Sequence, residues 1–455
     1  MEDTIAAIST PMGTGGIAVI RISGDDAVKI ADKVFFGSKK LSDVPTHTVH
    51  YGFIKDKNGN KIDEVLTSVM LAPKTFTRED TVEISVHGGI TVSREALSAI
   101  VSAGARPAEP GEFTKRAFLN GRIDLSQAEA VIDIINAKTV LAKDNALSQL
   151  EGSLSAEIKA MRYELVHLAS QMQVIIDYPD EDLEDVSRED IENVCRGCIS
   201  KAQSLLKTAD GGKILRDGIR TAIAGKPNVG KSSLLNALSR SDRAIVTDIA
   251  GTTRDVIEEF VNLDGVPLLL ADTAGIHDTE DVVEKIGVEK SRNAIEEAEL
   301  VIAVLDGSAE IDGEDMKILE ETNGKRRIVL INKSDISDAD TERIRGMANG
   351  SPVISVSAKT SDGIDKLSEC IKSMYSIGSL SSSDGAVITN IRHKKALEDA
   401  ADALKRAVLA LSGGMPTDIA SIDINAAIDS LGEITGETVS ESIVNDIFHS
   451  FCVGK

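Results

Sequence analysis

Short apolar runs and helical patterns alternate between residues 217 and 375. The apolar runs lie at 219–224, 266–271, 327–331 and 352–356. The first of them is followed by a helical pattern at 231–240, and alternation of this kind predicts an α/β domain. The dipeptide at 264–265 is a two-residue turn signal, so we also expect an antiparallel hairpin formed by 255–264 and 266–270.

The segments on both sides of this region have helical patterns. Amphipathic segments continue to about residue 206, and a last one ends near residue 451. The segments 126–129 and 438–441 each have the Ser/Thr-x-x-Glu pattern of a capping box. Neither helical stretch is expected to be self-sufficient, so we predict one discontinuous α-helical domain into which the α/β domain is inserted.

The N-terminal part has a third pattern. Short strand patterns at 17–22, 66–71 and 81–87 are mixed with two helical patterns, which predicts an α+β domain. A Ser/Gly-rich linker follows the α/β domain at 376–385. The predicted domains are 1–118, 119–216, 217–378 and 379–455.

Composition narrows the classes of function. The 455 residues carry a formal net charge of −23, which argues against general nucleic-acid binding because such binding depends on Lys and Arg that neutralise phosphates. Tryptophan is absent, so stacking platforms for single strands are not evident. Three basic clusters could still contact RNA, although we interpret each as an ordinary solvated cluster: Lys115 and Arg116 with Arg122, 325–327, and 392–395.

The sequence favours a cytoplasmic protein without a membrane segment. No run approaches 18 apolar residues, and residues 1–10 lack the features of a signal peptide. Cys195 and Cys198 form one Cys-x-x-Cys pattern inside a helical segment, without a second pair. We interpret them as helix surface and core rather than as a zinc or redox site.

The most informative motif lies at 225–232. It fits G-x-x-x-x-G-K-[ST] between an apolar run and a helical pattern, which is the context that a phosphate-binding loop requires. Backbone N–H groups of such a loop bind phosphate, Lys231 reaches the β and γ phosphates, and the Ser232 hydroxyl binds Mg²⁺. A nucleoside triphosphate is the predicted ligand.

Four further motifs predict that the base is guanine and that segments near the γ-phosphate change conformation on hydrolysis. Asp272 to Gly275 follow the second apolar run, where a carboxylate would lie beside the magnesium ion. Asp335, in Asn332-Lys333-Ser334-Asp335, can accept N1–H and the exocyclic amino group of guanine, which adenine cannot supply. Residues 357–359 complete the base pocket, and 251–254 place Thr253 in a mobile loop. The five motifs occur in the order of a GTPase.

One position departs from Ras-like proteins. The residue after 272–275 is Ile276, which cannot orient water as the usual glutamine does. Arg254 is a candidate arginine finger, but it can equally be a solvated charge of the switch loop. A monovalent cation could act in place of an arginine, and Asn228 has a side-chain carbonyl suited to holding one.

The chain resembles the tRNA-modification GTPase family MnmE, also called TrmE, over essentially its whole length. The resemblance rests on 3–24, on 110–130, on the GTPase motifs and on the terminal sequence Phe-Cys-Val-Gly-Lys at 451–455. It implies an N-terminal domain related to folate-binding aminomethyltransferases, which dimerises and binds 5-formyltetrahydrofolate or a related folate. It also implies a heterotetramer with the flavoprotein MnmG or GidA, which holds FAD and uses NADH, and action on the wobble uridine of certain tRNAs.

The resemblance assigns roles to residues of this chain. Folate contacts fall on Arg21, Glu83, Arg122 and Lys455, although each taken singly could be a surface ion pair. K⁺ ligands fall on Asn228, Thr247, Ile249 and Thr252, and Mg²⁺ ligands on Ser232 and Thr253. Glu284 would orient the attacking water, with Lys231 and Asp272 as the other residues of GTP hydrolysis. The predicted GTP contacts are Asn228, Val229, Gly230, Lys231, Ser232, Ser233, Thr247, Asp248, Ile249, Ala250, Gly251, Thr252, Thr253, Asp272, Thr273, Ala274, Gly275, Asn332, Lys333, Asp335, Ser357, Ala358 and Lys359.

Several alternatives stay open at this point. Cys452 could act as a nucleophile near a one-carbon donor, or could be structural. A ribosome-assembly GTPase of the Era or Der kind would share the GTPase motifs, but it should carry an RNA-binding module or a second GTPase domain, and neither is visible. A nucleotide-gated scaffold whose N-terminal domain only dimerises is the other rival.

Overall fold

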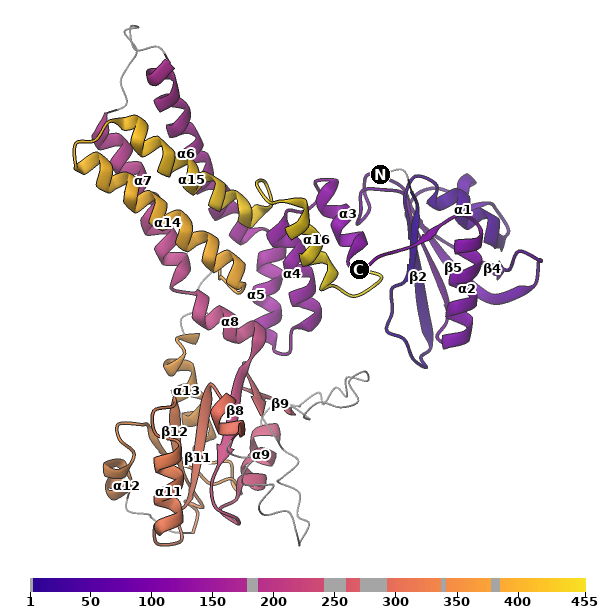
Figure 1. Cartoon of the computed structure of the whole chain (residues 1–455). Helices are drawn as coiled ribbons and strands as arrows, with labels where there is room; N and C mark the ends of the chain where they lie inside the picture. The colour runs from indigo at the N-terminus through magenta and orange to yellow at the C-terminus, as the bar shows by residue number, and fades with distance from the viewer. Residues whose placement is uncertain (1–2, 178–186, 241–258, 271–292, 337–340, 378–384) are drawn as a thin grey trace. The chain divides into compact units, whose positions relative to one another are not determined.

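The structure is a computed structural model, and it describes residues 3–177, 187–240, 259–270, 293–336, 341–377 and 385–455 (Figure 1). The chain divides into two compact units. The first combines Met1–Ile132, Leu150–Tyr163 and Ile428–Lys455, and the second combines Asp133–Gln149 and Glu164–Ala427. Both units therefore contain segments that are distant in sequence.

The first unit is built on a seven-stranded sheet. Its strands, in spatial order, are β3 (Phe35–Gly37), β4 (Thr48–Lys55), β5 (Lys61–Met70), β6 (Thr81–His87), β2 (Ile17–Ser23), β1 (Ile5–Ile8) and β7 (Arg106–Pro107). All neighbours are antiparallel except β1 and β7. Helices α1 (Ala27–Val34) and α2 (Ile90–Ser102) pack on the sheet and share one apolar core with it (Figure 1). The predicted α+β fold of this region is confirmed.

The second unit contains a six-stranded sheet. Its order is β13 (Val353–Ser355), β12 (Arg327–Asn332), β11 (Leu300–Asp306), β8 (Ile219–Ala224), β10 (Val266–Leu270) and β9 (Glu259–Leu263). All pairs are parallel except the hairpin β9–β10. Asp264 and Gly265 between these strands have φ values of 49° and 89°, as a type I′ turn requires. The described part of the predicted hairpin is thus confirmed, whereas β11 is a strand that the pattern above does not include.

Helices cover both faces of this second sheet. They are α9 (Lys231–Arg240), α11 (Gly313–Glu321), α12 (Thr341–Met347) and α13 (Ile364–Met374). Apolar residues of α9 and α13 join one core with the sheet, and those of α11 and α12 join another. Apolar cores on both faces of a mostly parallel sheet are the arrangement of an α/β nucleotide-binding fold, so the α/β prediction is confirmed.

The remaining helices form the helical parts of the two units. They are α3 (Glu112–Leu119), α4 (Leu125–Asn136), α5 (Val140–Leu150), α6 (Ser153–Asp177), α7 (Arg188–Leu206), α8 (Ala209–Asp217), α14 (Ile391–Ser412), α15 (Thr417–Thr435) and α16 (Glu441–His449). Helices α7 and α14 pack along each other in the second unit. Cys195 and Cys198 on α7 are both fully buried, and burial raises their pKa values to about 11 and about 12. Both are core residues with protonated thiols, so the predicted surface position of one of them is wrong.

The two predicted capping boxes are placed differently in the structure. Helix α4 already begins at Leu125, and its box consists of Asp124 and Gln127, whose side chains accept from each other's backbone N–H. Helix α16 begins after Ser440, and Thr438 donates to the carbonyl of Asp429 instead. The predicted boxes are therefore wrong in both places: α4 is capped by Asp124, and the N-cap residue of α16, Ser440, forms no side-chain capping hydrogen bond.

The connections into and out of the α/β region lie side by side. Gly212 of α8 packs so closely on the carbonyl of Ile388 that a Cβ could not fit there. The Thr208 hydroxyl accepts a 3.0 Å hydrogen bond from the backbone N–H of Ile388. Adjacent entry and exit segments are what an inserted domain needs, while the domain boundaries given above stay a prediction.

Two of the basic clusters contain arginines that are neither solvated nor available to RNA. Arg116 is fully buried and forms ion pairs with Asp3, Glu79 and Glu112. Arg327 is 3% exposed, and its guanidinium donates to the Leu319 and Ala348 carbonyls. For these two residues, the interpretation as RNA contacts and the interpretation as solvated charges are both wrong, because both side chains are buried. A buried guanidinium is stable only where its N–H groups find acceptors. In the part of the chain that the structure describes, no helix is long and apolar enough to cross a membrane.

Candidate functional site

The loop 225–232 connects the end of β8 to the start of α9, as a phosphate-binding loop does. The Lys231 ammonium lies inside the loop and donates to the carbonyls of Gly225 and Lys226, each at 2.7 Å. Burial lowers the pKa of Lys231. Ser232 and Ser233 are exposed at the first turn of α9, where their hydroxyls can meet a ligand.

The sharp backbone of this loop depends on two residues with positive φ. Asn228 has a φ of 64° and an exposed side chain, so its carbonyl can face a ligand. Gly230 has a φ of 96°, and a Cβ there would collide with the side-chain amide of Asn332. The loop therefore has room for this amide only because residue 230 is glycine.

Asn332 joins the phosphate loop to the predicted base pocket. It is 2% exposed at the end of β12, where its amide donates to the carbonyl of Val229 at 2.8 Å. Its side-chain oxygen accepts from the backbone N–H of Ala358 at 3.0 Å. Lys333 has a φ of 66° and pairs with Asp306 at 2.6 Å. One buried amide thus holds the two motifs together.

Asp335 has the exposure and ionisation that guanine recognition requires. Its side chain is exposed and accepts a 2.7 Å hydrogen bond from Ser357. This hydrogen bond is the main reason why the pKa of Asp335 is lowered, with Lys359 adding a smaller electrostatic effect. The carboxylate is therefore ionised and can accept both N–H groups of a guanine.

Several predicted nucleotide residues lie outside the described residues. They are Thr247, Asp248, Ile249, Ala250, Gly251, Thr252, Thr253, Asp272, Thr273, Ala274, Gly275 and Glu284, together with Arg254 and Ile276. The roles assigned to them stay predictions. The structure brings together the remaining nucleotide residues, from Asn228 to Ser233 and from Asn332 to Lys359.

A second group of residues meets the C-terminal tail in the first unit. Val453 forms a bridge with Pro110, and the carbonyl of Cys452 accepts from the N–H of Gly111 at 3.3 Å. Gly454 has a φ of 95° and lies directly against the backbone of Ile8, leaving no room for a Cβ. The tail is thereby fixed on β1, with the Cys452 side chain exposed.

Arg21 is the residue that the sheet presents to this tail. It is the Cα partner of Glu83 on the neighbouring strand, and its Nε donates to the Glu83 carboxylate at 2.8 Å. Its guanidinium also reaches the carbonyl of Gly454 at 3.5 Å and lies 5.6 Å from the centre of the Phe113 ring. Lys455, the neighbour of Gly454, is partly buried.

Arg122 contacts a small apolar cluster that also contains Phe113. Phe113 packs together with Phe76, and the Arg122 guanidinium lies 5.0 Å from the centre of the Phe76 ring. Burial and, to a smaller extent, the charge of Arg78 lower the pKa of Arg122. Among the described residues, neither Arg78 nor Arg122 forms an ion pair with a carboxylate. Two adjacent guanidiniums of this kind can bind an anionic ligand.

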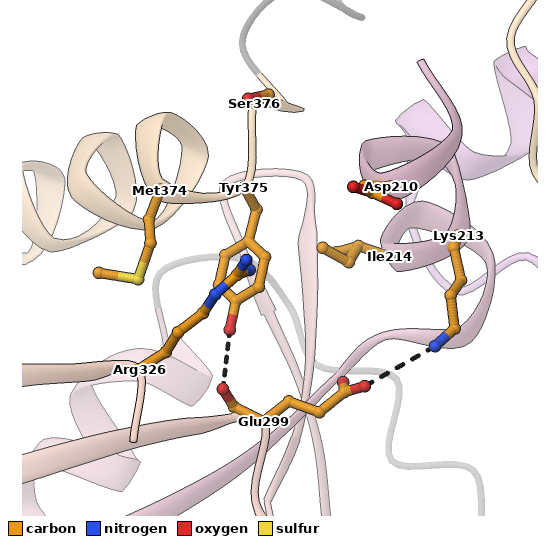
Figure 2. Close-up of a pocket in the computed structure, with 8 residues that line it drawn as sticks. All are labelled: Asp210, Lys213, Ile214, Glu299, Arg326, Met374, Tyr375 and Ser376. Carbon is orange, nitrogen blue, oxygen red and sulfur yellow. Dashed lines mark hydrogen bonds and ion pairs between the residues drawn. The ribbon is translucent and has the colours of Figure 1, made fainter. Parts of the chain in front are cut away.

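The pocket in Figure 2 is separate from both groups. A cavity of about 450 Å³ is lined by Asp210, Lys213, Ile214, Glu299, Arg326, Met374, Tyr375 and Ser376. Arg326 lies over the Tyr375 ring, and the Tyr375 hydroxyl donates to the carbonyl of Glu299 at 3.1 Å (Figure 2). None of the lining residues belongs to the predicted nucleotide or folate contacts, and acidic and basic side chains balance in it.

Comparison with known proteins identifies the family. A family model described as the GTP-binding protein TrmE N-terminus matches residues 4–122, and one described as the MnmE helical domain matches residues 125–452. The chain belongs to the MnmE (TrmE) family. The MnmE membership and the GTPase class predicted from the motifs are both confirmed.

Curated MnmE relatives match over the full chain. The tRNA modification GTPase MnmE of Lactobacillus acidophilus is 51% identical over 454 residues, which cover 100% of this chain and 98% of the relative. The protein of the same name from Bacillus subtilis is 49% identical over 458 residues and is covered completely. The solved G domain of the T. maritima FeoB iron transporter is 27% identical, covers 34% of this chain and 97% of that chain, and gives a TM-score of 0.26.

The motifs did not predict some residues that lie at the nucleotide motifs and around the C-terminal tail. Asp306 and Lys226 support the nucleotide motifs through ion pairs. Phe76, Phe113 and Arg78 lie around Arg21, Arg122 and the tail residues 452–455, which we call the tail site. Asp306 ends a continuously apolar run, which is a usable sign of a strand end facing a ligand. The two phenylalanines carry no such sign, because their meeting depends on tertiary packing.

Proposed function

We propose that the chain is a dimeric, K⁺-activated GTPase that modifies certain tRNAs together with the flavoprotein MnmG or GidA in a heterotetramer. The modification is an aminomethyl or carboxymethylaminomethyl group at C5 of the wobble uridine. The one-carbon unit comes from 5-formyltetrahydrofolate or a related folate, while FAD and NADH belong to the partner. GTP hydrolysis drives association of the GTPase domains and a change of conformation, and supplies no atoms to the product.

The observation that carries this proposal is the docked C-terminal tail beside Arg21 in a chain that also has a GTPase site. A ribosome-assembly GTPase needs the nucleotide motifs but has no use for a tail fixed on an N-terminal sheet. The resemblance places folate contacts on Arg21, Glu83, Arg122 and Lys455. The structure brings the first two into contact with each other and the first close to the tail.

The residues of the nucleotide site fit GTP with its metal ions. The loop has the glycine-rich sequence whose backbone N–H groups bind phosphate. Lys231 uses two of its three N–H donors on the carbonyls of Gly225 and Lys226 and can offer the third to a phosphate oxygen. Ser232 with Thr253 would hold Mg²⁺. Asn228, Thr247, Ile249 and Thr252 would hold K⁺. When bound, these cations supply positive charge that neutralises the developing charge of phosphoryl transfer.

The residues around the tail also fit a folate. Folate carries carboxylates on its glutamate part, and Arg78 with Arg122 forms a pair of guanidiniums that lacks a carboxylate partner among the described residues. The partly exposed pair Arg21 and Glu83 offers N–H donors and carboxylate oxygens to a pterin ring. Phe76 and Phe113 supply the apolar surface between them. Cys452 is exposed beside this site, and its chemical role stays open.

The outer face of the first sheet supports the proposed homodimer. Tyr51 and Leu66 are directly paired across β4 and β5, and Phe36 is paired with Phe53 across β3 and β4. Tyr51, Leu66, Phe36 and the neighbouring Val49 are all exposed. An apolar patch of this kind on a strongly charged protein is typical of an interface, and we assign it to a second copy of the chain.

Nucleoside mass spectrometry of tRNA tests the proposed function. In a strain that lacks the gene, C5-substituted wobble uridines should disappear and should return with the wild-type gene. They should not return with Lys231→Ala, which removes the phosphate-binding ammonium, nor with Arg21→Ala, which removes the folate contact.

Persistence of these nucleosides in the deletion strain would contradict the modification function while leaving the GTPase class intact. Ribosome profiles of the same strain would then test the ribosome-assembly alternative. Return of the nucleosides with Arg21→Ala but not with Lys231→Ala would contradict only the folate assignment.

A further inference from the structure

We propose that Lys226 is a positioning residue of the nucleotide site, which anchors the first half of the phosphate-binding loop to the N-terminus of helix α11. Lys226 is one of the variable positions of the motif and has no assigned contact with the nucleotide. The proposal rests on the GTPase class alone and does not depend on folate, K⁺ or tRNA.

The side chain of Lys226 reaches two carboxylates at once. Its ammonium lies 2.7 Å from Asp312 and 2.8 Å from Asp315. The side chain is 15% exposed, and that of Asp315 is 5% exposed. Hydrogen bonds to the two carboxylates raise the pKa of Lys226, so the ammonium is charged at neutral pH. Asp312 is 56% exposed, so Asp315 is the covered partner. An ammonium shared between two carboxylates is held more firmly than one in a single exposed pair.

The two carboxylates are themselves fixed by the helix. Asp312 caps α11 and accepts from the backbone N–H groups of Glu314 and Asp315. Asp315 completes the capping box by accepting from the N–H of Asp312 at 3.2 Å. Helix α11 packs on β11 in a buried core. Lys226 is therefore attached to a rigid element and not to a mobile side chain.

The backbone of the same residue holds the phosphate-binding lysine. The carbonyl of Lys226 accepts a 2.7 Å hydrogen bond from the Lys231 ammonium. Pro227 follows, and Asn228 then takes a positive φ of 64°. The side chain of Lys226 thus fixes the peptide that orients Lys231, although Lys226 is not among the predicted GTP contacts.

The consequence concerns nucleotide affinity more than stability. Without the anchor, the loop from Gly225 to Asn228 has additional conformations, and the binding-competent one is populated for a smaller fraction of the time. Apparent affinity falls by that fraction. An ion pair that served only the fold would lower the melting temperature and leave the affinity of the folded protein unchanged.

Titration of the full-length protein with a fluorescent GDP analogue tests the proposal. We expect Lys226→Met to weaken binding roughly tenfold, and Lys226→Arg to restore it because a guanidinium can also bind two carboxylates. Lys317→Met changes an exposed lysine of the same helix and serves as the control. Melting temperatures of all variants are measured in parallel.

A double-mutant cycle identifies the partner. Asp312→Asn keeps a good helix cap but removes the charge that faces Lys226, so it should weaken binding in the same direction. The double variant Lys226→Met with Asp312→Asn should be no weaker than Lys226→Met alone. Unchanged affinity in Lys226→Met, no rescue by Lys226→Arg, or additive losses in the double variant would each overturn the proposal.

Discussion

The nucleotide site and the tail site are assembled in different ways. The nucleotide residues follow the carboxyl ends of the parallel strands β8 and β12, and each motif is contiguous in sequence. The tail site brings Arg21 of strand β2 and Phe113 of helix α3 together with Gly454, which follows Arg21 by 433 residues. A parallel sheet gathers loops at one edge by its topology, whereas the tail site exists only after long-range packing.

Because of this difference, we expect that a substitution can abolish ligand binding at one site without affecting the other. The nucleotide site is held by the buried amide of Asn332 and by the anchor at Lys226, both inside the second unit. The tail site is held by Gly454 and by the bridge of Val453 with Pro110, all inside the first unit. Substitutions at one site should therefore leave ligand binding at the other nearly unchanged.

The largest effect is expected for Gly230→Ala. The added Cβ would collide with Asn332, and the positive φ of residue 230 is unfavourable for alanine. We expect GDP affinity to fall by roughly a thousandfold, about the loss of two or three backbone contacts to phosphate. Isothermal titration measures this loss, with Gly313→Ala as the matched control because nothing lies within 4 Å of its Cβ position.

A smaller loss is expected for Asp335→Asn. The amide cannot accept both N–H groups of guanine, so GTP affinity should fall by about a hundredfold. Xanthine has a carbonyl in place of the exocyclic amino group, so xanthosine triphosphate should bind the variant better than the wild type. Competition titrations with both nucleotides measure this change of base preference. An unchanged preference for guanine would rule out Asp335 as the specificity residue.

Gly454→Ala acts on the other site. Alanine cannot fit against Ile8 at a φ of 95°, so the tail should leave β1 and expose Arg21. We expect affinity for 5-formyltetrahydrofolate to fall about tenfold, with GDP affinity within about twofold of wild type. Gly13→Ala in the same unit is the control, since its Cβ position is open. Wild-type folate binding by a variant with a released tail would separate the tail from the site.

The smallest expected effect concerns the helix cap near the tail site. Burial tends to raise the pKa of Asp124, but hydrogen bonds from Lys159, Ser155, Gln127 and Ser126 outweigh it and lower the pKa below its ordinary value. A lowered pKa in the folded state stabilises the protein above the unfolded value, and this contribution is lost as the pH falls through the folded value.

Asp124→Asn should therefore lower the melting temperature by roughly 2–4 °C at pH 7. The difference from wild type should shrink as the pH falls below about 4, the ordinary pKa of an aspartate. Differential scanning calorimetry between about pH 3 and pH 7, a range that includes the ordinary pKa of an aspartate, is the measurement. A difference that does not depend on pH would mean that the Asp124 charge contributes nothing.

The sequence predicts the bounds of buried strands in the α/β region better than the bounds of a half-buried strand in the first unit. The apolar run at 219–224 and the predicted hairpin strand at 266–270 match β8 and β10 to the residue, since fully buried strands leave an unbroken apolar pattern. Strand β5 begins at Lys61, five residues before the predicted run, because its first half includes the charged residues Lys61, Asp63 and Glu64 and leaves no apolar run. Half-buried strands of this kind are harder to delimit.

The buried charges show what a sequence pattern cannot resolve. Arg116 and Arg327 stand in clusters of basic residues, yet both are buried with acceptors supplied by distant segments. Whether an arginine is solvated depends on carboxylates and carbonyls that only the fold brings near. The same reason explains why Arg78 was not among the predicted residues of the tail site.

Separate measurement of GTP hydrolysis and folate binding in Lys231→Ala and Arg21→Ala tests most directly whether one chain carries two independent sites. We expect Lys231→Ala to lose hydrolysis while its affinity for 5-formyltetrahydrofolate stays within about twofold of wild type. Arg21→Ala should lose folate affinity and keep hydrolysis. Loss of both properties in either folded variant, or wild-type folate binding by Arg21→Ala, would contradict the separation of the two sites.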